Sequence, residues 1–187
     1  MKLAKFPQIR PHFALLLPWL LSACVSSSPK PDFDQQQAAK ARVELALGYL
    51  QQHQLSQAKL NLDKALNYAP DYYLVHSALA YFYQQQGDVT QARKAYTQAI
   101  ELDEKQGDVR NNYGTFLCGQ GEFEQAYAQF QAALNTPNYY QQADTLENFA
   151  LCAYSQNNSV IYQENLVKLE KISPARAAQL KSAVNSR

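Results

Sequence analysis

The sequence has few of the residues from which enzyme active sites are usually built. Its 187 residues include only three histidines and three cysteines. The histidines, His12, His53 and His76, are widely spaced, and the chain has no HExxH, CxxC or glycine-rich phosphate loop. The acidic residues are scattered, as on solvated helix faces. We therefore expect a protein that is not an enzyme and that has no metal site and no cofactor.

The chain also has no large excess of charge of one sign. Seventeen Lys and Arg residues face 16 Asp and Glu residues, which gives a formal net charge of +1. A protein that binds nucleic acid usually carries a basic face. We expect no nucleic-acid partner.

Long apolar runs are missing as well. The only candidate, residues 13–21, is nine residues long and is interrupted by Pro18, whereas a membrane-spanning helix needs about 20 apolar residues. Lys2, Lys5 and Arg10 precede this run, and no acidic residue occurs before Asp32. A basic start followed by a short apolar stretch is typical of an export signal.

The four residues that end this signal, Leu21-Ser22-Ala23-Cys24, resemble a bacterial lipobox. The resemblance implies removal of residues 1–23 and acylation of Cys24; the alternative is an ordinary signal with an incidental cysteine. Acyl chains on Cys24 would anchor the protein, because each buried methylene contributes about 0.8 kcal/mol. By resemblance to Gram-negative lipoproteins, Val25 implies no retention at the inner membrane. We expect a lipid-anchored protein on the periplasmic face of the outer membrane.

Removal of the signal changes the charge of the chain. It takes away three of the 17 basic residues and none of the 16 acidic ones, which leaves 14 against 16 and a net charge of −2. Residues 25–37 are rich in Ser and Pro, so we expect residues 24–38 to form a flexible tether. Residues 39–187 then form one domain.

The domain is built from a repeat of 34 residues. Small residues recur at this spacing in three columns: Ala58, Ala92 and Ala126; Ala46, Ala80 and Gly114; Ala65, Ala99 and Ala133. Large apolar residues fill other columns, such as Leu62, Tyr96 and Phe130. This period and pattern resemble the tetratricopeptide repeat, a helix–turn–helix unit. We predict an all-α solenoid that is monomeric.

The repeats are expected at residues 39–72, 73–106, 107–140 and 143–176, with a capping helix at 177–187. Gly87 and Gly121 fall at the turn between the two helices, where a left-handed conformation is needed. The fourth repeat follows a two-residue slip and is degenerate, because Tyr162 and Leu169 occupy small-residue columns. We expect its helices to be splayed or packed differently.

Two cysteines remain after Cys24 is assigned to lipid. Cys118 and Cys152 are also 34 residues apart, in the last turns of two consecutive first helices. The periplasm is oxidising, so a disulfide is expected between them. The alternative is two buried free thiols, which cores tolerate well.

The first helix of each repeat is expected to face a concave groove. Apolar residues gather at the N-terminal end of this groove: Val43, Leu47, Leu50, Leu74 and Tyr81. An apolar patch on a soluble solenoid usually marks a binding site, unless residues 33–38 fold back and cover it. Asn112 and Asn148 could clamp a peptide backbone, because an amide both donates and accepts; alternatively they are polar residues on a wet face. The 13 tyrosines are expected to serve packing, with an aromatic ligand box as the alternative.

Three segments indicate which family of tetratricopeptide-repeat proteins the chain resembles. They are ARVELALGYLQQHQLSQAKLNLDKAL (41–66), NNYGTFLCGQGEFEQAYAQFQAAL (111–134) and ADTLENFALCAYSQNN (143–158). Together with the lipobox they resemble the PilF/PilW family of type IV pilus biogenesis lipoproteins. The resemblance implies a pilotin, which binds the pilus secretin and promotes its outer-membrane localisation and ring assembly. It also implies that other members carry further repeats beyond the fourth.

A second function remains open from the sequence. Some other repeat-bearing lipoproteins are periplasmic envelope adaptors that recruit peptidoglycan enzymes or act with barrel-assembly partners. The sequence alone does not name the secretin segment that would be bound.

Overall fold

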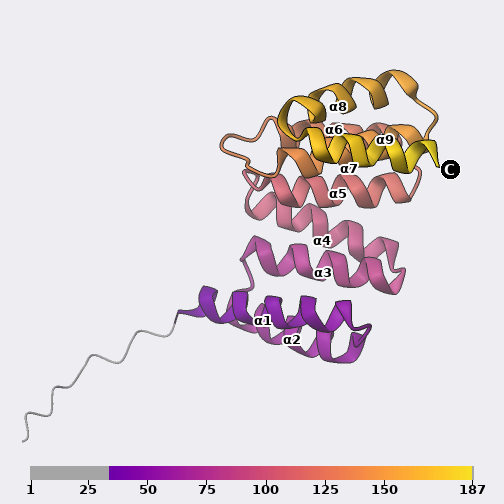
Figure 1. The fold of residues 1–187 in the computed structure, drawn as a ribbon. Coiled ribbons are helices and arrows are strands. Elements are labelled where there is room, and N and C mark those ends of the chain that lie inside the picture. Colours follow the sequence, from indigo (N-terminus) through magenta and orange to yellow (C-terminus); the bar gives the residue numbers. More distant parts are fainter. Residues whose placement is uncertain (1–33, 187) are drawn as a thin grey trace, which may run out of the picture. The chain divides into compact units, whose positions relative to one another are not determined.

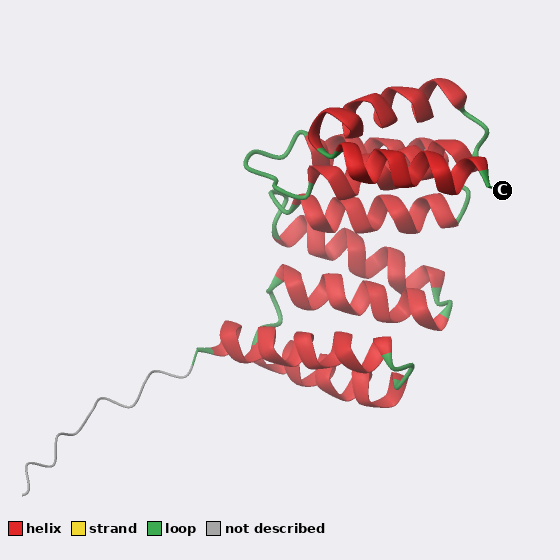
Figure 2. Ribbon diagram, viewed as in Figure 1, coloured by secondary structure: helices red, strands yellow, loops and turns green. Residues whose placement is uncertain are grey.

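The computed structural model describes residues 34–186, and every regular element in that part is an α-helix (Figure 2). The helices are α1 (Gln35–Gln51), α2 (Leu55–Tyr68), α3 (Tyr73–Gln86), α4 (Val89–Leu102), α5 (Gly107–Gly119), α6 (Phe123–Leu134), α7 (Gln142–Ser155), α8 (Ser159–Ile172) and α9 (Pro174–Asn185). They stack in chain order, from α1 and α2 at one end to α8 and α9 at the other (Figure 1). The predicted all-α solenoid of four helix pairs and a final helix is confirmed. The predicted signal, Cys24 and most of the tether lie outside the described residues.

Small residues let the two helices of each repeat approach closely. Ala58, Ala92 and Ala126 are fully buried, as the repeat pattern predicts. Gly114 allows a close approach of α5 to α6, because a Cβ atom at this position would lie 2.8 Å from Cδ1 of the Phe130 ring. The small residue at this position therefore lets α5 lie close to α6, and the Phe130 ring fills the space between the two helices.

The turns between paired helices share one backbone conformation. Gly87 and Gly121 have φ of 76° and 77°, and His53 and Asn157 take the same left-handed region at the equivalent positions. The second helix then begins with an N-cap; in α4 the Asp88 carboxylate accepts a hydrogen bond from the Gln91 backbone N at 3.0 Å. The predicted turn positions are correct.

Two predicted boundaries differ from the structure. α1 begins at Gln35, so residues 35–38, which the sequence predicts as part of the tether, belong to the helix. Asp34 caps it by accepting a hydrogen bond from the Gln37 backbone N, and Gln and Ala are good helix formers. Residues 35–38 therefore continue the first helix and do not fold back over the groove. At the other end, the final helix begins at Pro174 and not at 177, because proline suits the first helical position.

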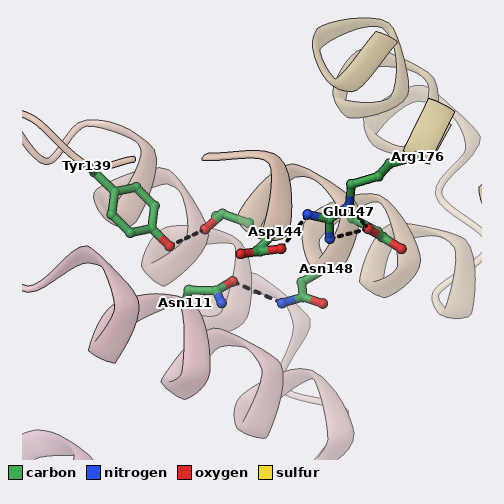
Figure 3. A network of polar contacts seen from close by, with 7 residues as sticks. Asn111, Tyr139, Asp144, Glu147, Asn148 and Arg176 are labelled. Atoms are coloured by element: carbon green, nitrogen blue, oxygen red, sulfur yellow. Dashed lines mark hydrogen bonds and ion pairs between the residues drawn. The ribbon is translucent and has the colours of Figure 1, made fainter. Parts of the chain in front are cut away.

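The fourth repeat keeps a helix pair but has a core of its own. Leu146, Ala150, Leu166 and Leu169 pack with Ala177 and Leu180 of α9, separately from the main core. Arg176 of α9 also pairs with Asp144 and with Glu147 of α7 (Figure 3). The bulky Leu169 is thus buried against a capping helix that the first three repeats do not have.

Within residues 34–186, no helix is both long and apolar enough to cross a membrane.

Candidate functional site

A cavity of about 420 Å³ runs along the first helices of the four repeats. We call it the groove. Its lining comes from α1, α3, α5 and α7, with one residue from α4: Val43, Leu47, Leu74, Ser77, Ala78, Tyr81, Gln84, Tyr96, Asp108, Asn112, Thr115 and Asn148. Residues far apart in the sequence meet here because each repeat contributes its first helix to the same face.

One end of the groove is apolar. Leu47 and Leu74 are partly buried and pack against the core, and the Tyr81 side chain is 36% exposed. Val43 also lines the groove but is only 1% exposed, so it shapes the wall more than it offers open surface. The prediction for Leu50 is wrong, because this residue is 5% exposed, belongs to the core and does not line the groove. The reason is that α1 packs against α3 as well as α2.

The other end of the groove is polar. Asn112 is exposed and Asn148 is partly buried, and both line the cavity as predicted. They do not form two equivalent rungs, however. The amide nitrogen of Asn148 donates to Oδ1 of the buried Asn111 at 3.1 Å (Figure 3). Asn112 is therefore the freer of the two amides.

The floor of the groove contains a residue that the sequence assigned only to the core. Tyr96 is 1% exposed, and its hydroxyl donates a hydrogen bond to Oε1 of Gln84 at 3.0 Å. Burial raises the pKa of this hydroxyl above its ordinary value, so it stays protonated and neutral at physiological pH. The position of Tyr96 in the repeat correctly predicts that the residue is buried. It does not predict that the residue also lines the groove.

A disulfide joins the first helices of the third and fourth repeats. Cys118 of α5 and Cys152 of α7 are bonded in the structure, with their Cα atoms 5.8 Å apart. Neither residue lines the groove. The bond links the third repeat to the degenerate fourth one.

The described part of the chain contains no cluster of side chains that could bind a metal ion. Among residues 34–186, no group of three or more His, Cys, Asp or Glu side chains is placed to hold a metal ion. What the groove offers is an elongated surface, apolar at one end and rich in hydrogen-bonding groups at the other. Such a surface suits a segment of another protein.

Comparison with known proteins agrees with this description. Residues 84–143 match the family model of the tetratricopeptide repeat. The chain is 57% identical over 169 residues to an uncharacterized protein of Haemophilus influenzae, and the match covers 90% of this chain and 94% of that one. It is 31% identical over 179 residues to the type IV pilus assembly protein PilF of Pseudomonas aeruginosa, covering 92% of this chain and 71% of PilF.

A solved structure supports the same relationship. The structure of Pseudomonas aeruginosa PilF superposes with a TM-score of 0.73 at 29% identity, over 80% of this chain and 68% of that one. Sequence identity above 30% across most of both chains, together with a shared helical stack, establishes common descent. The chain belongs to the family of tetratricopeptide-repeat proteins that includes the type IV pilus assembly protein PilF.

Proposed function

We propose that this protein is a pilotin, which binds the type IV pilus secretin subunit in its groove and promotes secretin localisation and ring assembly at the outer membrane. The observation that carries the proposal is the groove itself. It is a cavity of about 420 Å³, lined by four repeats, in a protein of the PilF family.

The two ends of the groove suit different parts of a bound segment. Leu47, Leu74 and Tyr81 would receive apolar side chains of the secretin. The amides of Asn112 and Asn148 would pair with its backbone, because each amide can donate and accept. The segment binds in extended or helical form, as in other peptide-recognition grooves.

Anchoring is the second part of the proposal. Acylation of Cys24 at the lipobox would hold the protein at the periplasmic face of the outer membrane. Metabolic labelling with a fatty-acid analogue tests this step. The natural chain should take up label and a Cys24→Ser variant should not; label retained in the variant would contradict lipid attachment at Cys24.

Secretin binding is tested by co-purification with a groove variant. Leu47→Glu combined with Tyr81→Ser places a charge on the apolar wall and removes a ring, so secretin affinity should fall by about 30-fold or more. Leu60→Glu is the matched control, because Leu60 of α2 is 49% exposed and does not line the groove. The circular-dichroism spectrum should stay helical in both variants.

Deletion of the gene tests the assembly role. The expected result is loss of surface pili, with the secretin left as monomers. Normal pili and normal secretin multimers in the deletion strain would overturn the pilotin proposal.

A further inference from the structure

A second, smaller cavity adjoins the polar end of the groove. It has a volume of about 160 Å³, and three tyrosines line it: Tyr73 at the start of α3, and Tyr139 and Tyr140 from the segment between α6 and α7. We call it the tyrosine hollow. Asp108, in the first turn of α5, lines both the hollow and the groove. A segment bound in the groove could therefore place one side chain in the hollow.

The loop that forms the hollow is held firmly. The Tyr139 hydroxyl lies 2.8 Å from Oγ1 of Thr145, and both residues are buried (Figure 3). The Tyr139 ring lies against Gly107, where a Cβ atom would be only 2.6 Å from Cδ2 of the ring. This close contact fixes the loop that the two-residue slip inserts.

Tyr140 differs sharply from its neighbour. Its side chain is 88% exposed, although it follows directly after a buried and hydrogen-bonded tyrosine. An aromatic ring presented in this way on a fixed loop is available to a ligand at little cost in backbone ordering.

The lining of the hollow includes one carboxylate that is available to pair with a cation. Within residues 34–186, the Asp108 side chain forms no hydrogen bond or ion pair. By contrast, Asp103 accepts a hydrogen bond from the Gln106 side chain at 2.7 Å, and Asp144 pairs with Arg176. Burial raises the pKa of the Tyr73 hydroxyl to about 12, and the Asp108 carboxylate adds to the effect. Tyr73 is therefore neutral at physiological pH and faces a negative field. Lys105 is the one cation in the lining.

We propose that the tyrosine hollow binds the cationic side chain of a lysine or arginine in the segment that occupies the groove. This proposal rests on the proposed function of the groove and adds to it the chemistry of the partner. The volume of the hollow is below the range of about 300–1,000 Å³ typical of small-molecule sites, so it suits a single side chain. The rings of Tyr73 and Tyr140 would contact the cation, and Asp108 would supply the counter-charge. Lys105 opposes binding and keeps its ammonium in water.

The test is an NMR titration of the full chain, carrying Cys24→Ser, with N-acetyl-lysine methylamide. The neutral analogue N-acetyl-norleucine methylamide is the matched control ligand. The lysine probe should shift the ring signals of Tyr73 and Tyr140 in a saturable manner, and the norleucine probe should not. Equal responses to both probes, or no saturable shift with lysine, would overturn the proposal.

Substitutions test which side chains of the hollow contribute to lysine binding. Asp108→Asn and Tyr140→Leu should each weaken lysine binding by about fivefold, and Lys105→Gln should strengthen it. Glu101→Gln, an exposed change on α4, is the control and should leave binding unchanged. Loss of binding in the control, or unchanged binding in Asp108→Asn, would contradict the assignment.

Two further outcomes distinguish this proposal from a site for a small quaternary ammonium ion and from the pilotin proposal. Tetramethylammonium that binds more tightly than the lysine probe would assign the hollow to a small quaternary ammonium ion and overturn a side-chain role. The titration contains no secretin, so lysine binding together with failed secretin capture would reject only the pilotin proposal. Secretin capture without lysine binding would reject only the inference about the hollow.

Discussion

The side-chain amide nitrogen of Asn148 donates a hydrogen bond to Oδ1 of Asn111 at 3.1 Å, and this contact joins α7 to α5 (Figure 3). Asn111 is 5% exposed, while Asn148 lies at the edge of the groove. The Asn148 side chain therefore belongs both to the wall of the groove and to the contact between the third and fourth repeats. The neighbouring Asn112 is exposed.

This arrangement predicts different effects for the two amides that line the groove, Asn112 and Asn148. Asn148→Ala should lower the free energy of unfolding by about 1–3 kcal/mol, because it leaves the buried Oδ1 of Asn111 without its donor. Asn112→Ala should stay within about 0.5 kcal/mol of the natural chain. Urea denaturation of both variants checks this, and secretin capture by Asn112→Ala then reports binding alone. Equal stability losses would show that the Asn111 contact contributes nothing.

The disulfide between Cys118 and Cys152 should stabilise the fourth repeat. A bridge with a sequence separation of 34 residues contributes about 3–4 kcal/mol in the loop-entropy model. Reduction, or Cys118→Ser with Cys152→Ser, should lower the urea midpoint accordingly, with the largest gain in hydrogen exchange in α7 and α8. Thiol counting on denatured, unreduced Cys24→Ser protein should find no free thiol, and two free thiols would refute the bond.

Gly114 should tolerate no side chain. Gly114→Ala would place its Cβ 2.8 Å from Phe130, a fully buried ring, and overpacking of this kind costs about 1–3 kcal/mol. Gly48→Ala is the matched control, because Gly48 lies inside α1 with nothing within 4 Å of the new Cβ. The control should be more stable by about 0.5–1 kcal/mol. Thermal unfolding measures the difference in stability between the two variants. Similar melting temperatures for Gly114→Ala and Gly48→Ala would contradict the prediction.

Stability should fall at alkaline pH because several tyrosine hydroxyls are buried. Burial raises the pKa of Tyr73 to about 12 and also raises the pKa of Tyr96, Tyr127 and Tyr139. A raised folded-state pKa favours the protonated form, so this stabilisation is fully present below pH of about 10, the ordinary tyrosine pKa, and is lost above it. Urea midpoints between pH 8 and 11.5 should therefore decline. Tyr96→Phe should make the decline shallower, and an unchanged slope in that variant would exclude Tyr96 as a contributor.

The helices, their pairing and their turns could be predicted from the amino-acid pattern alone. A period of 34 residues fixes which positions of each repeat face its own partner helix, because the same small and large columns must fit together in every copy. The left-handed turn is a local requirement that glycine meets without strain, so Gly87 and Gly121 marked it directly. Most of the groove lining followed from the same periodicity, as Leu47, Tyr81 and Asn112 show.

How much of that face remains open depends on contacts between repeats, which are seen only in the three-dimensional structure. Leu50 occupies a groove-facing position of its repeat and is nevertheless buried, because α1 also packs against α3. The tyrosine hollow likewise brings Tyr73, at the start of α3, together with Tyr140, from the segment between α6 and α7. Contacts between successive repeats depend on the rotation of one helix pair against the next and on the sizes of the side chains between them. That rotation results from packing across the whole stack, and no periodicity within a single repeat encodes it.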